Sequence, residues 1–119
     1  SNVISTTPPG TRAVDAANWL KKHGNDASRV FVETREVIYL VGWPYFGSQA
    51  QSIRGRDEAI AALASGRIDL VLLDLPSDVP GLSQWAEEKG LRSVEQFSDA
   101  RNKTIHAFVR APNLTAEER

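Results

Sequence analysis

The chain has 119 residues, of which 41% are hydrophobic and 24% charged, and its 14 basic and 15 acidic side chains leave a formal net charge of −1. This balance gives no global electrostatic attraction for nucleic acid or anionic lipid. The absence of cysteine excludes disulfides, zinc-thiolate sites and thiol catalysis. Because no run approaches the roughly 18 apolar residues of a membrane span, we expect one soluble globular domain.

The sequence of the N-terminal part predicts an extended linker followed by a helix. Residues 1–10 lack periodicity and include Pro8-Pro9-Gly10, so they read as a linker. From Thr11, a plausible N-cap, small and apolar residues recur at helical spacing up to Gly24, namely Ala13, Ala16, Ala17 and Leu20. We therefore place one domain at residues 11–111 and a tail at 112–119.

The middle of the chain alternates between strand and helix patterns. RVFVE (29–33) predicts a strand, REVIYLVG (35–42) a short helix and QSIRG (51–55) a weak strand. RDEAIAALASG (56–66) predicts a helix with Ala59, Ile60 and Leu63 on one face. IDLVLLDL (68–75) has the near-continuous apolar run of a central parallel strand covered on both faces.

The C-terminal part predicts one more helix and a hairpin. PGLSQWAEEKG (80–90) places Leu82, Trp85 and Ala86 inward, and the strands VEQF (94–97) and TIHAFVR (104–110) follow, joined by a polar turn. The predicted fold is a three-layer α/β sandwich of the Rossmann-like or flavodoxin-like kind. Its sheet should be mostly parallel, of about five strands in the order 2-1-3-4-5, with an antiparallel edge hairpin.

The end of the predicted central strand has two interpretations. IDLVLLDLPSDVPG resembles the phosphoacceptor strand of bacterial receiver domains, with Asp74 as acceptor. That chemistry needs Mg²⁺ held by an acidic cluster, yet Glu33 is followed by Thr34 and Arg35. The lysine expected at the end of the last strand is also missing, because Arg110 stands there. The alternative function is thus a receiver-like or degenerate receiver domain. In the plain structural interpretation Asp74 caps the following loop.

A second resemblance covers residues 13–110. A helix carrying Trp-Leu, here Trp19-Leu20, precedes the first strand, and a Tyr-x-x-Gly-x-Pro corner, here Tyr39, Gly42 and Pro44, follows that strand. A Ser-Gly-Arg turn, Ser65-Gly66-Arg67, precedes the central strand, and a hairpin closes the domain. This order resembles the soluble C-terminal domain of polytopic membrane glycosyltransferases of the GT-C class, which use polyprenyl-phosphate-linked sugars.

The resemblance implies a non-catalytic domain without cofactor or metal, because the catalytic carboxylates of such enzymes lie in loops of the membrane part. It implies the extracytoplasmic face of the membrane, either periplasmic or cell-exterior. The implied partners are the membrane-embedded part of the same polypeptide and a saccharide or lipid-linked acceptor.

Two groups of residues are candidates for ligand contact. Trp43 and Tyr45 should bracket Pro44 near the surface, where aromatic rings can face a saccharide or a membrane interface, while Tyr39 should be buried at the end of the short helix.

Arg54 and Arg56 flank Gly55 before a helix N-terminus and could hold a phosphate, although solvated charge is the favoured explanation. His23 lies beside a predicted helix C-terminus, and His106 lies in a predicted strand, with no nucleophile or carboxylate placed near either by sequence.

Overall fold

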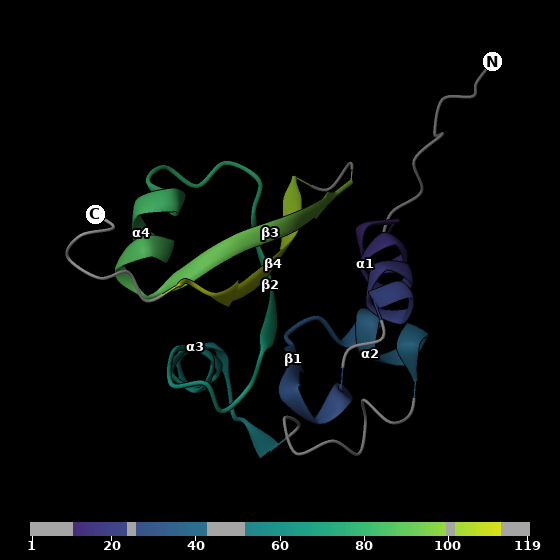
Figure 1. The fold of residues 1–119 in the computed structure, drawn as a ribbon. Coiled ribbons are helices and arrows are strands. Elements are labelled where there is room, and N and C mark those ends of the chain that lie inside the picture. The colour runs from purple at the N-terminus through teal and green to yellow at the C-terminus, as the bar shows by residue number, and fades with distance from the viewer. Residues whose placement is uncertain (1–10, 24–25, 43–51, 100–101, 113–119) are drawn as a thin grey trace.

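The computed structural model describes residues 11–23, 26–42, 52–99 and 102–112. In chain order the elements are α1 (Thr11–His23), a 3₁₀ helix (Ala27–Arg29), β1 (Val30–Val32), α2 (Arg35–Val41), α3 (Arg56–Ala64), β2 (Leu70–Pro76), α4 (Leu82–Glu88), β3 (Leu91–Ser98) and β4 (Lys103–Arg110). Figure 1 shows the sheet running between α1 and α2 on one side and α3 and α4 on the other. The expected α/β arrangement, with helices on both sides of a sheet, is confirmed.

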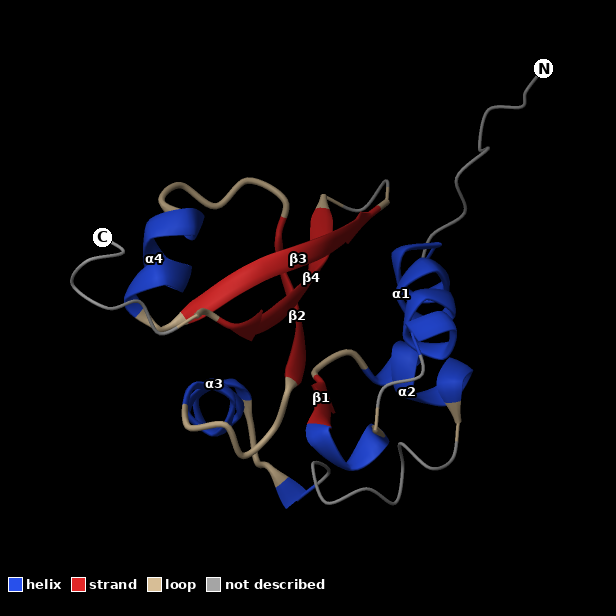
Figure 2. Ribbon diagram, viewed as in Figure 1, coloured by secondary structure: helices blue, strands red, loops and turns tan. Residues whose placement is uncertain are grey.

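The described strands form one mixed sheet in the order β1-β2-β4-β3 (Figure 2). β1 pairs with β2 in parallel, with Val30 opposite Leu70, whereas β4 lies antiparallel to both β2 and β3. The β3–β4 hairpin contains a register shift between Ser93 and Glu95. The hairpin predicted from the two closely spaced strand patterns is therefore confirmed.

The expected sheet of five mostly parallel strands is not confirmed. Within the described ranges there are four strands and one parallel pair, and residues 52–55 of the expected strand at 51–55 lie outside any strand. The physical reason is that a continuous apolar run reports burial on both faces of a strand but not the direction of its neighbours. The returning strand of the hairpin, β4, takes the place beside β2 and so makes the sheet mixed.

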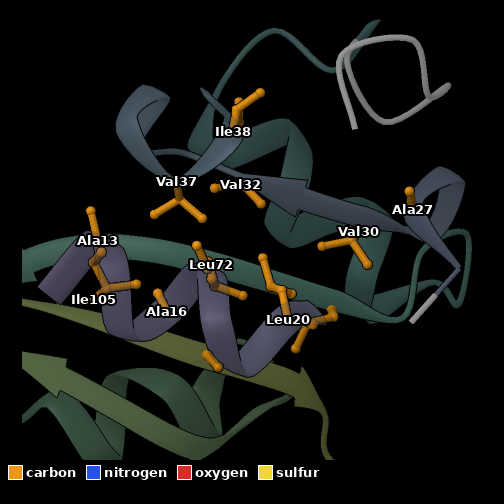
Figure 3. Close-up of a cluster of buried hydrophobic side chains, with 13 residues drawn as sticks. Ala13, Ala16, Leu20, Ala27, Val30, Val32, Val37, Ile38, Leu72 and Ile105 are labelled. Atoms are coloured by element: carbon orange, nitrogen blue, oxygen red, sulfur yellow. The ribbon is translucent and has the colours of Figure 1, made fainter. Parts of the chain in front are cut away.

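Two hydrophobic clusters cover the two faces of the sheet. The first, shown in Figure 3, joins α1 and α2 to Val30, Leu72 and Ile105. The second joins α3 and α4 to alternate residues of the same strands, among them Val71 and Phe108. Because alternate residues of a strand point to opposite faces, β2 supplies both clusters, which explains its near-continuous apolar sequence.

Helix α1 packs closely on the sheet because its inner face is small. The apolar positions expected from the sequence are all at most 1% exposed, namely Ala13, Ala16, Ala17 and Leu20. Alanine side chains allow the helix backbone to approach the strands, and Leu20 fills the space at the other end of the helix. The prediction of an amphipathic helix in this part of the chain is confirmed.

Helix α2 forms as expected, but its burial pattern corrects one assignment. Val37 and Ile38 are buried, whereas Tyr39 is 63% exposed and Leu40 is 44% exposed, so the expectation of a buried Tyr39 is wrong. Each helical residue advances by about 100° around the axis, so the residues immediately after Val37 and Ile38 turn away from the core. The neighbouring candidates Trp43 and Tyr45 lie outside the described residues.

We predict that Leu20→Ala destabilises the domain by about 2–5 kcal/mol, because it leaves a cavity under α1. Tyr39→Ala should cost about 1 kcal/mol or less, because most of the ring is already in water. Urea denaturation of the two variants measures the difference. Equal losses at the two positions would contradict the inner and outer faces assigned to these helices.

Candidate functional site

A group of charged side chains gathers at the carboxyl ends of the two parallel strands. Glu33 follows β1 directly, and Asp74 lies near the end of β2. Asp74 shares the face of Leu70 and Leu72 and therefore points toward α1. Open α/β sheets bind ligands most often at this kind of edge, so the partners of the two carboxylates decide what this site can do.

Arg12, in the first turn of α1, holds Asp74 through two hydrogen bonds. Its Nε donates to Oδ1 at 3.1 Å and its Nη2 donates to Oδ2 at 3.0 Å. The third guanidinium nitrogen, Nη1, donates to Oδ2 of Asp99 at 3.1 Å. The side chains of Arg12 and Asp99 are only 5% and 0% exposed, respectively. The hydrogen bond to Asp74 and the two nearby negative charges raise the pKa of Arg12, although burial acts in the opposite direction.

Arg56, at the start of α3, holds Glu33 in the same two-pronged way. Its Nε and Nη2 donate to the two carboxylate oxygens at 2.9 and 2.7 Å. The hydrogen bond to Glu33 raises the pKa of Arg56. The arginine–carboxylate network, as we call it, consists of Arg12, Glu33, Arg56, Asp74 and Asp99.

Backbone hydrogen bonds join the two halves of this network. The amide of Asp74 donates to Oε1 of Glu33 at 2.9 Å, and Nη2 of Arg56 donates to the carbonyl of Asp74 at 3.2 Å. The network thereby connects α1, the ends of β1 and β2, the start of α3 and the segment after β3. Because its carboxylates are already bound by guanidinium groups, the network holds these elements together and does not present free acids or bases.

The structure brings some of the sequence candidates together and separates others. Asp74 and Arg56 belong to one network, whereas Arg54 is exposed and takes no part in it. Since the Arg56 guanidinium is occupied by Glu33, Arg54 and Arg56 do not form a shared anion site in this arrangement. In the part of the chain that the structure describes, no three His, Cys, Asp or Glu side chains cluster in a way that could hold a metal ion.

Sequence reasoning missed Arg12 and Asp99. A signal for Arg12 was present, because it precedes Ala16 by four residues and so lies on the inner face of α1. A cation on a buried helix face requires an anionic partner. No local pattern names that partner, because Asp74 is 62 residues away and Asp99 is 87 residues away.

The two histidines have contrasting environments. His106 is only 4% exposed, and its ring stacks on Phe108 with the ring centroids 5.7 Å apart. Among the residues that the structure describes, its Nδ1 has no hydrogen-bond partner. Burial lowers the pKa of His106, because the charged imidazolium loses its hydration. His23 is exposed on α1, where its Nδ1 lies 2.9 Å from the carbonyl oxygen of Trp19.

A cleft of about 1210 Å³ lies on the other face of the sheet, between α4 and the β3–β4 hairpin. It is lined by Ala64, Leu82, Ser83, Ala86, Glu87, Gly90, Leu91, Arg92, Ser93, Gln96, Phe108, Arg110, Ala111 and Pro112. None of the network residues lines this cleft. The molecule therefore has one sheet edge where the charged groups are paired with one another and, on the other face, a cleft lined by both polar and apolar residues.

No protein-family model, curated protein or solved structure matches this chain. Among the described residues, no helix has the length and apolar character needed to cross a membrane.

We predict that Arg12→Leu destabilises the domain by about 3–5 kcal/mol, because it leaves two poorly hydrated carboxylates without their cation. Arg29→Leu is the matched control, since Arg29 pairs with Asp69 in an exposed salt bridge and should matter much less. Urea denaturation at neutral pH measures both variants. Similar losses in the free energy of unfolding for the two variants would show that the buried Arg12 pairs stabilise the domain no more than the exposed Arg29–Asp69 pair.

We also predict that His106 makes the domain less stable in mild acid. Its folded-state pKa is lowered, so its contribution is fully present above the unfolded pKa of about 6.5 and is lost as the pH falls below that value. Denaturant midpoints measured from pH 8 to pH 5, a range of about 3 units around that pKa, should fall less steeply in His106→Leu than in the parent chain. An unchanged slope in His106→Leu would assign the acid sensitivity to other groups.

Proposed function

We propose that this chain is a non-catalytic, extracytoplasmic α/β domain of an integral-membrane glycosyltransferase of the GT-C class. In this proposal the domain packs on the membrane-embedded part of the same polypeptide and assists recognition of a saccharide or lipid-linked acceptor. The chemistry itself would occur in the membrane part. The domain would need neither a metal nor a cofactor of its own.

The observation that carries the proposal is the state of the carboxylates at the sheet edge. Glu33 and Asp74 occupy the positions where an α/β enzyme would place reactive groups, but each accepts two hydrogen bonds from an arginine. A general acid or base must exchange a proton with a substrate, which a carboxylate held in this way does poorly. An architectural role for the edge fits this arrangement, and the order of motifs along residues 13–110 supports the assignment to the glycosyltransferase class.

A receiver-like signalling domain is the second candidate. Asp74 does lie near the end of a central strand, as the phosphoacceptor position requires. However, phosphorylation would need Asp74 to release Arg12, and Mg²⁺ would need Glu33 to release Arg56. The pairing of both carboxylates therefore favours the first proposal over the second.

The location of the domain separates the two functions experimentally. The chain has no cysteine, so Asn18→Cys and Glu88→Cys each introduce one reactive thiol at an exposed helical position. In cells producing the complete polypeptide, we predict that a membrane-impermeant maleimide labels both positions without lysis. The polypeptide without these substitutions supplies the background.

Labelling only after lysis would place the domain in the cytoplasm and overturn the proposal. A cytoplasmic protein carrying an exposed cysteine must remain unlabelled in the same intact cells, which controls for leakage of the reagent.

A further inference from the structure

Strand β3 forms one edge of the sheet, and its outer side has no partner among the described strands. Figure 1 shows this edge from the front, with no described helix or strand drawn over it. Residues 92–96 are all exposed. The opposite edge strand, β1, has only three residues. The sheet therefore has one long edge whose outward-facing amide and carbonyl groups are open to another strand.

The irregularity of β3 limits which strand could pair with it. Proteins often block an open edge with lysine or proline, but the eight residues of β3 include neither. The register shift between Ser93 and Glu95 forms a bulge, at which Val94 has no partner residue in β4 and is 42% exposed. A bulge increases the local twist and disturbs pairing with a regular strand. A strand that pairs with β3 must therefore match the bulge.

The register shift also places two opposite charges on one face of β3. Arg92 lies opposite Val109 of β4, and Glu95 lies opposite Ala107. Val109 and Ala107 are alternate residues that both belong to the packing under α1, so Arg92 and Glu95 share that face. Three positions apart in a regular strand, they would point to opposite faces. Both are exposed, and among the described residues neither forms a salt bridge.

We propose that β3 is a dimerisation edge, which pairs in the antiparallel direction with β3 of a second copy of this chain. A two-fold axis between Ser93 and Val94 places Arg92 opposite Glu95 of the second copy, and Glu95 opposite Arg92 of the second copy. Opposite charges attract at directly facing positions of an antiparallel pair. The same axis brings the two bulges side by side, so each strand meets a partner of its own shape.

This proposal does not rest on the proposed function, because it concerns only the edge of the sheet in this chain. One strand edge buries less surface than a stable dimer does, so the association should be weak and reversible. The test is sedimentation equilibrium of the chain over a concentration series at low salt. We expect a monomer–dimer equilibrium and, in a ¹⁵N-labelled sample, concentration-dependent amide shifts centred on Ser93, Val94 and Gln96. A monomer at every concentration, or shifts centred on another element, would overturn the proposal.

Charge reversals then test the register of the two strands. Arg92→Glu places acidic residues opposite one another at two positions of the dimer, and Glu95→Arg does the same with basic residues. Each variant should weaken dimerisation roughly tenfold. The double variant restores both pairs with the charges exchanged, so its affinity should return to within about twofold of the parent value. An equimolar mixture of the two single variants should form the heterodimer, because every facing pair in it is again of opposite charge.

Arg35→Glu is the matched control, since it makes the same change in net charge at an exposed position of α2 and should leave dimerisation unchanged. If Arg92→Glu does not fold, Glu95→Arg and the double variant decide the matter. A double variant that dimerises as weakly as the single variants would overturn the proposed register. An equal loss in Arg35→Glu would assign the effect to net charge and overturn the role of the facing pairs.

Discussion

The rest of the structure depends on the burial of one arginine. Arg12 lies on the inner face of α1, only 4% exposed, and its guanidinium is divided between Asp74 and Asp99. Removing such a cation from water costs several kcal/mol, which is recovered only when its donors meet acceptors in good geometry. Helix α1 can therefore pack on the sheet only in a position where the Arg12 guanidinium meets both carboxylates. This requirement specifies the position of α1 more narrowly than its alanine-rich face could.

The same constraint extends to the other helical layer through Glu33 and Arg56. Glu33 accepts from Arg56 at the start of α3 and from the backbone of Asp74, so the ends of β1 and β2 are joined to helices on both faces. This is the edge where α/β proteins commonly place ligands. Filling it with ion pairs makes it part of the scaffold.

The mixed sheet follows from the length of the connections around β2. The segment from β1 to β2 contains two helices among its described residues and returns the chain in parallel, as a crossover connection must. After β2, the chain forms only the short α4 before the hairpin begins, and β4 comes back beside β2 in the antiparallel direction. β3 is left as the outer strand, mostly exposed, with the register shift that often marks such edges.

The sequence alone determined the local burial of most elements. The spacing of Ala13, Ala16 and Leu20, the apolar run of β2 and the paired strand patterns of the hairpin are short-range signals, because helix and strand periodicities repeat within a few residues. It also placed Asp74 at a strand end. Tyr39 shows the limit of this reasoning, since an aromatic residue beside a predicted corner carried no information about which way the helix would turn it. Only the tertiary structure decided the strand order, the partner of Arg12 and the separation of Arg54 from Arg56. Those features depend on contacts between residues far apart in the chain, and many pairings over such distances are compatible with the same local patterns.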